Sequence, residues 1–122
     1  MPTFTKCRQN LEEMEPWYDH WLRVVGTAVI AGPSDYAGQI PDQSCADMSP
    51  SRRRACYRLG RRMTVLSDGT IASCEQDVLG RQRQGEVMGD GLSRTWRERF
   101  PILRAEHEKG ALCTSCKEWH RP

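Results

Sequence analysis

The apolar positions of residues 11–31 follow a helical pattern and then a strand-like one. Five side chains recur at spacings of three and four residues and therefore share one helical face: Met14, Trp17, Tyr18, Trp21 and Val25. Asn10 with Glu13 matches a capping box, while Pro16 favours a main helix that begins near residue 15. Gly26 predicts the end of the helix. We expect the apolar face to pack in a core or an interface.

A short, β-branched apolar run, Thr27 to Ala31, follows this helix and predicts a buried strand. A helix followed by a buried strand is half of an α/β unit, and such a half cannot cover its own faces. Residues 1–32 are therefore interpreted as the end of a larger α/β domain. Residues 33–51 are rich in Pro, Gly, Ser, Asp and Gln, which predicts a linker.

The pattern changes to strand and turn signals in residues 52–122. Arg61 to Leu66 and Ile71 to Ser73 predict two strands joined at Asp68-Gly69, a dipeptide that favours tight hairpins. Residues 75–91 contain four glycines and are predicted to form a loop. Leu92 to Arg99 predicts a helix that Pro101 ends, and a second helix follows through Lys109 with His107 on its surface. Together these elements predict a small α+β domain.

Composition and charge limit the cellular compartments and the partners that we expect for the chain. The longest apolar-leaning run, Val24 to Gly32, is too short to span a bilayer, so we expect no membrane association. Six cysteines without a secretory signal favour metal ligation in a reducing, cytoplasmic compartment. Residues 1–50 carry three basic and seven acidic side chains, or −4, while residues 51–122 carry fifteen and nine, or +6, which together give the net charge of +2. The half with most of the cysteines is thus the basic half.

Four of the cysteines have the spacing of metal ligands. Cys113 and Cys116 form a C-x2-C pair, and the predicted hairpin carries Cys74 back towards Cys56. Four thiolates suit zinc or an iron–sulfur cluster, and the spacing does not choose between them. The alternative is a set of buried structural cysteines or disulfides. Cys45 lies in the linker and is either a plain loop residue or a spare ligand.

The run Arg52-Arg53-Arg54 precedes Cys56 and has two interpretations. In the first, it is a solvated basic turn. In the second, it has a functional role: its charges compensate an anionic cluster, contact a carboxylate or contact another domain. Trp119 is expected to shield the metal site. His120 is a fallback ligand that a full set of four thiolates would not need.

Several of these motifs occur together in an order that resembles a known family. They are Cys56-x12-Gly69-x4-Cys74, the hairpin RRMTVLSDGTIASC, the later GDGLSRTW, and CTSCKEW. Residues 52–122 therefore resemble a SPASM domain, the C-terminal auxiliary iron–sulfur domain of radical S-adenosylmethionine (SAM) enzymes. Residues 6–32 look like a late helix and strand of the radical SAM barrel that precedes this domain.

The resemblance implies a cofactor, partners and a fold. Cys56, Cys74, Cys113 and Cys116 would bind one 4Fe-4S cluster, with zinc or no metal in a fragment prepared in air. The domain would support electron transfer or the docking of a peptide or protein substrate, beside a radical SAM catalytic domain in the parent chain. The implied fold is a SPASM-like α+β domain with one β-hairpin, short helices and a cysteine metal knuckle, preceded by a helix–strand remnant of an α/β barrel.

Two departures from the family pattern limit these expectations. Longer patterns carry a further cysteine where this chain has Pro122, so at most one cluster is expected, with Cys45 in reserve. The C-x3-C-x2-C motif that binds the SAM cluster is absent, so the chain would not cleave SAM alone and only its parent would be the enzyme.

Two functions from other classes remain open. A zinc-binding structural or nucleic-acid-binding module would also use the four cysteines and the basic half. The scattered arginines lack interleaved aromatic residues, however, so we do not expect nucleic acid as a partner. A redox protein built on Cys113 and Cys116 would need a βαβ context around that pair.

Overall fold

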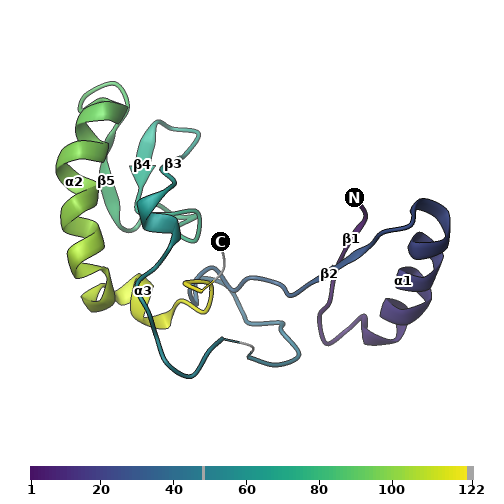
Figure 1. The fold of residues 1–122 in the computed structure, drawn as a ribbon. Coiled ribbons are helices and arrows are strands. Elements are labelled where there is room, and N and C mark those ends of the chain that lie inside the picture. Colours follow the sequence, from purple (N-terminus) through teal and green to yellow (C-terminus); the bar gives the residue numbers. More distant parts are fainter. Residues whose placement is uncertain (48, 121–122) are drawn as a thin grey trace. The chain divides into compact units, whose positions relative to one another are not determined.

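The computed structural model describes residues 1–47 and 49–120 and divides them into two compact units. The first unit contains residues 1–35 and 40–47, and the second contains residues 36–39 and 49–120. Within the described residues there are three α-helices and two β-sheets (Figure 1). The predicted α+β class is confirmed.

The first unit is a strand–helix–strand arrangement. Strands β1 (Thr3–Thr5) and β2 (Val29–Ala31) pair in parallel, and helix α1 (Leu11–Val25) connects them. A parallel pair with a helical crossover is the repeating unit of α/β proteins. The sequence pattern did not predict β1, and this strand completes the half-unit that the pattern did predict.

Helix α1 begins earlier than Pro16 suggested, and its cap differs from the predicted capping box. The Asn10 side chain accepts a hydrogen bond from the Cys7 N–H (2.8 Å) and donates one to the Thr5 carbonyl (3.0 Å). It therefore stabilises the turn from β1 into the helix and makes no hydrogen bond that caps α1. Gly26 ends the helix in the left-handed conformation (φ 74°), as predicted.

The apolar face of α1 is only half-covered. Trp17 packs against the ring of Phe4 in β1, with 5.3 Å between ring centroids, and lies 6.2 Å from Trp21. No residue of α1 is buried, and Val25 is 49% exposed. The predicted burial of strand β2 is also incomplete, because Ile30 is 39% exposed.

The second unit is built on a three-stranded antiparallel sheet, β3 (Thr64–Val65), β4 (Thr70–Ala72) and β5 (Arg83–Glu86), in that order. The predicted hairpin between β3 and β4 is confirmed. Gly69 has φ 85°, and the Leu66 N–H donates to the Thr70 carbonyl at 2.9 Å. Strand β5 lies in the stretch predicted as a loop, so that prediction was wrong for these four residues.

Helix α2 (Leu92–Glu106) packs on β5 and on the short 3-10 helix η1 (Arg58–Gly60). It runs through Pro101, where two separate helices had been predicted. A helical proline loses one hydrogen bond and crowds the carbonyl four residues earlier. The full burial of the neighbouring Phe100 offsets this cost, because its ring belongs to the core, as Leu59 and Ile71 do, and lies 4.9 Å from the Trp96 ring.

A second 3-10 helix, η2 (His107–Lys109), and helix α3 (Ala111–Ser115) complete the unit. In Figure 1 the chain passes from the base of α2 through these two elements towards the C-terminal segment. Among the described helices, none combines the length and the apolar character needed to cross a membrane.

The contact between β5 and α2 predicts a selective effect of two glycine substitutions. A Cβ at Gly85 would lie 2.8 Å from the Asp90 carboxylate and 3.0 Å from the Thr95 hydroxyl, whereas at Gly89 the nearest atom is 3.9 Å away. We expect Gly85→Ala to lower the free energy of unfolding by about 1–3 kcal/mol, the usual cost of overpacking. Gly89→Ala should change it by less than about 1 kcal/mol. Equilibrium urea unfolding followed by circular dichroism measures both, and equal effects would contradict the close packing.

Candidate metal centre

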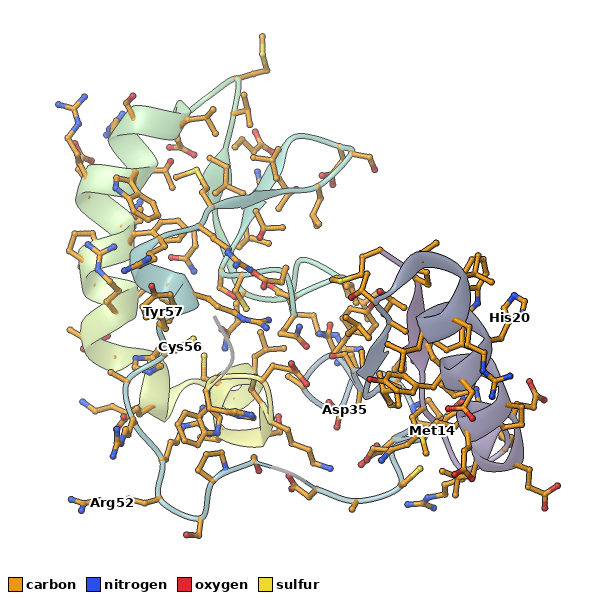
Figure 2. The ribbon with its side chains drawn as sticks, turned by 45° about the vertical axis from the view of Figure 1, so that its right-hand side comes forward. Met14, His20, Asp35, Arg52, Cys56 and Tyr57 are labelled. Atoms are coloured by element: carbon orange, nitrogen blue, oxygen red, sulfur yellow. The ribbon has the colours of Figure 1, made fainter. Side chains whose placement is uncertain are left out.

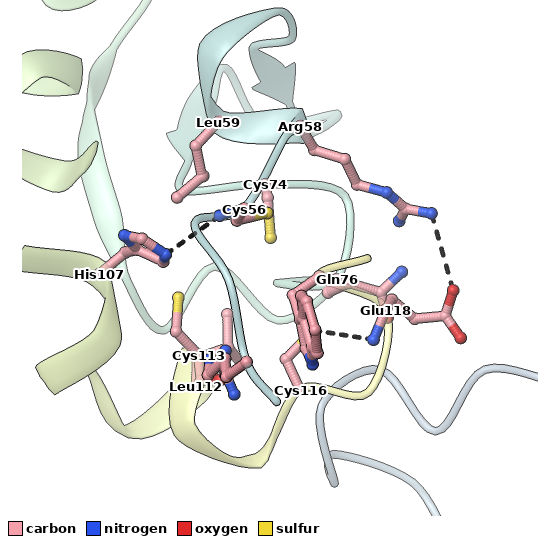
Figure 3. Close-up of a pocket in the computed structure, with 12 residues that line it drawn as sticks. Cys56, Arg58, Leu59, Cys74, Gln76, His107, Leu112, Cys113, Cys116 and Glu118 are labelled. Carbon is pink, nitrogen blue, oxygen red and sulfur yellow. Dashed lines mark hydrogen bonds and ion pairs between the residues drawn. The ribbon is translucent and has the colours of Figure 1, made fainter. Parts of the chain in front are cut away.

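The four predicted ligands line one small cavity in the second unit. Cys56 and Cys74 lie on one side of this cavity, and Cys113 and Cys116 lie on the other (Figure 3). They come from three segments that are far apart in the sequence: the residues before η1, the residues after β4, and α3 with its C-terminal end. Buried Leu59, Leu112 and Trp119 complete the apolar part of the wall.

A buried histidine holds the first of these segments. The Cys56 N–H donates to His107 Nε2 at 3.3 Å, and His107 Nδ1 lies 2.9 Å from the Arg104 carbonyl oxygen. A carbonyl only accepts, so Nδ1 carries the proton and Nε2 is the acceptor. His107 is 5% exposed, which corrects its prediction as a surface residue.

Two of the sulfurs accept hydrogen bonds from the backbone two residues further on. The Gln76 N–H donates to Cys74, and the Glu118 N–H lies 3.3 Å from the Cys116 sulfur. Hydrogen bonds to sulfur favour the thiolate and tune iron–sulfur clusters. The sequence pattern did not reveal these contacts, because they depend on the local turn after each cysteine.

The C-x2-C pair sits at the end of the short helix α3. Cys113 is inside the helix and buried, and the Cys116 N–H donates to the Cys113 carbonyl at 3.2 Å. This bond closes the turn that separates the two side chains. Pro122, where longer family patterns have a further cysteine, lies outside the described residues.

Burial favours the protonated thiol at three of the four cysteines, Cys74, Cys113 and Cys116. Burial, and then the nearby thiols of Cys74, Cys116 and Cys56, raise the pKa of Cys113 to about 12. Burial also raises the pKa values of Cys74 and Cys116, against the opposing effect of the backbone hydrogen bonds to their sulfurs. A cation that binds thiolate sulfur would displace these protons, as metal ions do at cysteine sites.

Arg53 brings positive charge to the cavity. Its guanidinium donates to the carbonyls of Cys113 and Thr114 and lies 5.8 Å from the centre of the Trp119 ring. It lowers the pKa values of Cys113 and Cys116, although burial outweighs this effect. Its Nε is buried without a hydrogen-bond partner among the described residues. An anionic group in the cavity would therefore meet both a charge and an unused donor.

An ion-pair network joins the three cysteine-bearing segments. Arg58, two residues after Cys56, pairs with Glu75 at 2.8 Å and with Glu118 at 3.6 Å. Glu75 follows Cys74 directly, and Glu118 comes two residues after Cys116. The side chains of Arg58 and Glu118 are 11% and 9% exposed, so solvent screens this pair little.

Residues 36–39, which fall within the predicted linker, contact two of these segments. Gln39 donates to the Gln76 carbonyl, and the Ser115 hydroxyl donates to the Ala37 carbonyl at 3.0 Å. Tyr36 and Ala37 both have positive φ, at 48° and 57°, a conformation that is uncommon for non-glycine residues. This turn thus touches the segments of Cys74 and of the C-x2-C pair.

The four cysteines share a cavity without forming a compact set of ligands for one metal ion within the described residues. In the part of the chain that the structure describes, no three His, Cys, Asp or Glu side chains are grouped as ligands of one metal ion. The four cysteines share a cavity and all are free. Cys7 and Cys45 belong to the first unit and do not line it.

Comparison with known proteins adds one relative. An uncharacterized protein from Treponema pallidum (strain Nichols) is 32% identical over 123 aligned residues, which cover 98% of this chain and 34% of that protein. The chain therefore spans about a third of the length of that relative. No family model matches the chain, and no solved structure matches it at a significant level.

The ion-pair network predicts a contrast between two arginines that contact the same carboxylate. Arg58→Met would leave Glu118 buried without this partner, and we expect it to lower the free energy of unfolding by about 3 kcal/mol. Arg62 also pairs with Glu75, at 3.1 Å, but its side chain is 53% exposed. Arg62→Met should therefore cost at most about 1 kcal/mol. Urea unfolding of both variants, with the metal content of each sample measured, tests this; equal losses would show that the network does not hold the segments together.

Proposed function

We propose that this chain is the auxiliary 4Fe-4S domain, of the SPASM type, of a radical SAM enzyme. The observation that carries the proposal is that Cys56, Cys74, Cys113 and Cys116, from three separate segments, line one cavity. These are the cysteines that the family pattern assigns to the cluster. Cys7 and Cys45, which the pattern leaves out, do not line it.

The surroundings of the sulfurs suit an anionic cluster. Backbone N–H groups donate to two of the four sulfurs, and Arg53 supplies positive charge and a buried donor without a partner. Trp119, at 6% exposure, and Leu59, at 1%, keep water from the cavity. Hydrogen bonding, charge and solvent exclusion are the means by which a protein sets a cluster's potential. When bound, the cluster would supply a one-electron relay.

The role we propose is support of catalysis in a larger protein. The chain lacks the C-x3-C-x2-C motif, so SAM cleavage would take place in a radical SAM catalytic domain of the parent. The parallel β1–α1–β2 unit, with its half-exposed apolar face, supports an origin at the end of an α/β barrel. This domain would then transfer electrons or hold a peptide or protein substrate.

The experiment that tests the proposal is anaerobic reconstitution with iron and sulfide. We expect a broad visible absorbance and about four irons and four sulfides per chain. After reduction, we expect the electron paramagnetic resonance spectrum of a 4Fe-4S cluster. Single Cys→Ala variants at positions 56, 74, 113 and 116 should each lose most of the absorbance. Cys7→Ala and Cys45→Ala are the matched controls and should keep it.

Other outcomes of this experiment would replace the proposal. A colourless chain that holds one zinc and no iron would favour a zinc-binding structural module. If Cys45→Ala loses the cluster and the Cys→Ala variant of one of the four predicted ligands keeps it, Cys45 would replace that residue in the ligand set.

The position of Arg53 predicts an effect on the cluster that depends on where the charge lies and not on the net charge of the chain. Arg53→Gln should shorten the lifetime of the reconstituted cluster in air several-fold, because the cavity loses positive charge and a donor beside Cys113. Arg97→Gln removes the same charge from the exposed surface of α2 and should leave the lifetime unchanged. Decay of the visible absorbance measures both, and equal lifetimes would show that Arg53 has no part in holding the cluster.

A further inference from the structure

Six arginines and no acidic residue lie between residues 49 and 62, and the fold uses only some of their charges. Arg53 binds the backbone beside Cys113, and Arg58 and Arg62 pair with Glu75. Within the described residues, the other three form no ion pair with a carboxylate: Arg52, Arg54 and Arg61.

The neighbouring arginines of this run differ in the cavity that they line. Residues 53–56 belong to no helix, strand or turn, and the side chains of the three successive arginines line different cavities. Arg53 lines the cysteine cavity, while Arg52 and Arg54 line a separate cleft of about 520 Å³. Figure 2 shows Arg52 pointing away from the loop that leads to Cys56 and Tyr57. The three arginines are thus divided between two cavities.

Aromatic rings form part of the rest of this cleft, beside Pro50, Ser51 and Ala55. Tyr57 is 45% exposed, and the Arg61 guanidinium lies 4.0 Å from the centre of its ring. Trp119 and His120 meet edge to face at 5.4 Å, and both line the cleft. The Nδ1 atom of His120 is buried and has no hydrogen-bond partner among the described residues. The cleft therefore combines positive charge, an unused polar atom and aromatic surface.

The cleft shares one wall with the cysteine cavity. Trp119 lines both, so a ligand in the cleft would contact a side chain that also borders the sulfurs. The cleft has the volume of a ligand pocket and is lined by two rings and one imidazole. It lacks the long basic groove with successive stacking rings that binds single-stranded nucleic acid.

We propose that this cleft binds an acidic peptide segment. Carboxylates of the peptide would pair with the guanidinium groups of Arg52 and Arg54, a geometry in which arginine forms two parallel hydrogen bonds. An apolar or aromatic side chain of the peptide would lie against Tyr57 and Trp119. The inference rests on the proposed function for its meaning, since it names the class of substrate that would dock beside the cluster.

The test uses the whole 122-residue chain, with its iron content measured, and three fluorescein-labelled probes. The first is a pentapeptide of four glutamates around a tryptophan, the second replaces each glutamate by glutamine, and the third is a single-stranded oligothymidylate. Fluorescence anisotropy at an ionic strength of about 0.15 M measures binding. We expect the glutamate peptide to bind and the glutamine peptide to bind at least about tenfold more weakly, because each charge-assisted pair is worth more than a neutral one.

Matched variants separate the cleft from general charge. Arg52→Gln/Arg54→Gln should weaken binding of the glutamate peptide about tenfold, and Tyr57→Ala should weaken it several-fold. Arg81→Gln/Arg97→Gln removes the same charge from exposed sites elsewhere and should change binding less than about twofold. Equal loss in both double variants would overturn the proposal. Tighter binding of the oligothymidylate, lost in the same cleft variants, would overturn it in favour of nucleic acid.

The outcome is independent of the cluster test. Peptide binding by a chain that takes up no iron would uphold the cleft and sink the proposed cluster function. A reconstituted chain that binds iron through the four cysteines and does not bind the glutamate peptide would uphold the cluster and sink the cleft.

Discussion

The cysteine site depends on Arg58, because this one cation is shared by carboxylates from the two other segments that supply sulfurs. Burial and the nearby thiols raise the pKa values of Cys74, Cys113 and Cys116, so gathering these side chains disfavours their thiolates. Their segments therefore need contacts that do not depend on the sulfurs. Arg58 supplies such contacts through Glu75 and Glu118, each within two residues of a cysteine. The histidine bond to the Cys56 backbone and the turn at residues 36–39 act in the same direction.

Short sequence motifs predicted the elements whose conformation depends mainly on residues close together in the chain. Asp68-Gly69 requires a positive φ at one position, and the hairpin formed there with Val65 opposite Ile71. Gly26 ended α1 for the same reason. The spacing of the four cysteines also identified side chains that now line one cavity. In each case a single short stretch, or the chemistry of one residue type, carried the information.

Tertiary contacts decided the elements that the sequence could not reveal. Residues 83–86 have little strand propensity, and β5 forms because β4 offers it an edge on which to pair. Pro101 predicts a break, but burial of Phe100 keeps α2 continuous. The neighbours of His107 in the sequence are polar, which is typical of a surface residue. Tertiary packing places its ring where it accepts a hydrogen bond from the Cys56 N–H. The turn at Tyr36 and Ala37 lies in the predicted linker, but it has no glycine at its first two left-handed positions, so the sequence did not indicate this conformation there.

The basic half of the chain shows how one charge run can divide between two environments. The sequence does not distinguish between the three arginines Arg52, Arg53 and Arg54. It therefore could not decide between a solvated turn and a functional role for this run. In the structure they are separated, because Arg53 donates to the backbone of Cys113 while Arg52 and Arg54 line the outer cleft. The inward charge offsets the unfavourable gathering of sulfurs, and the outward charges have no partner carboxylate among the described residues. A positive charge that the fold does not use in its own ion pairs is available to a ligand, and a ligand in this cleft would contact Trp119, which also lines the cysteine cavity.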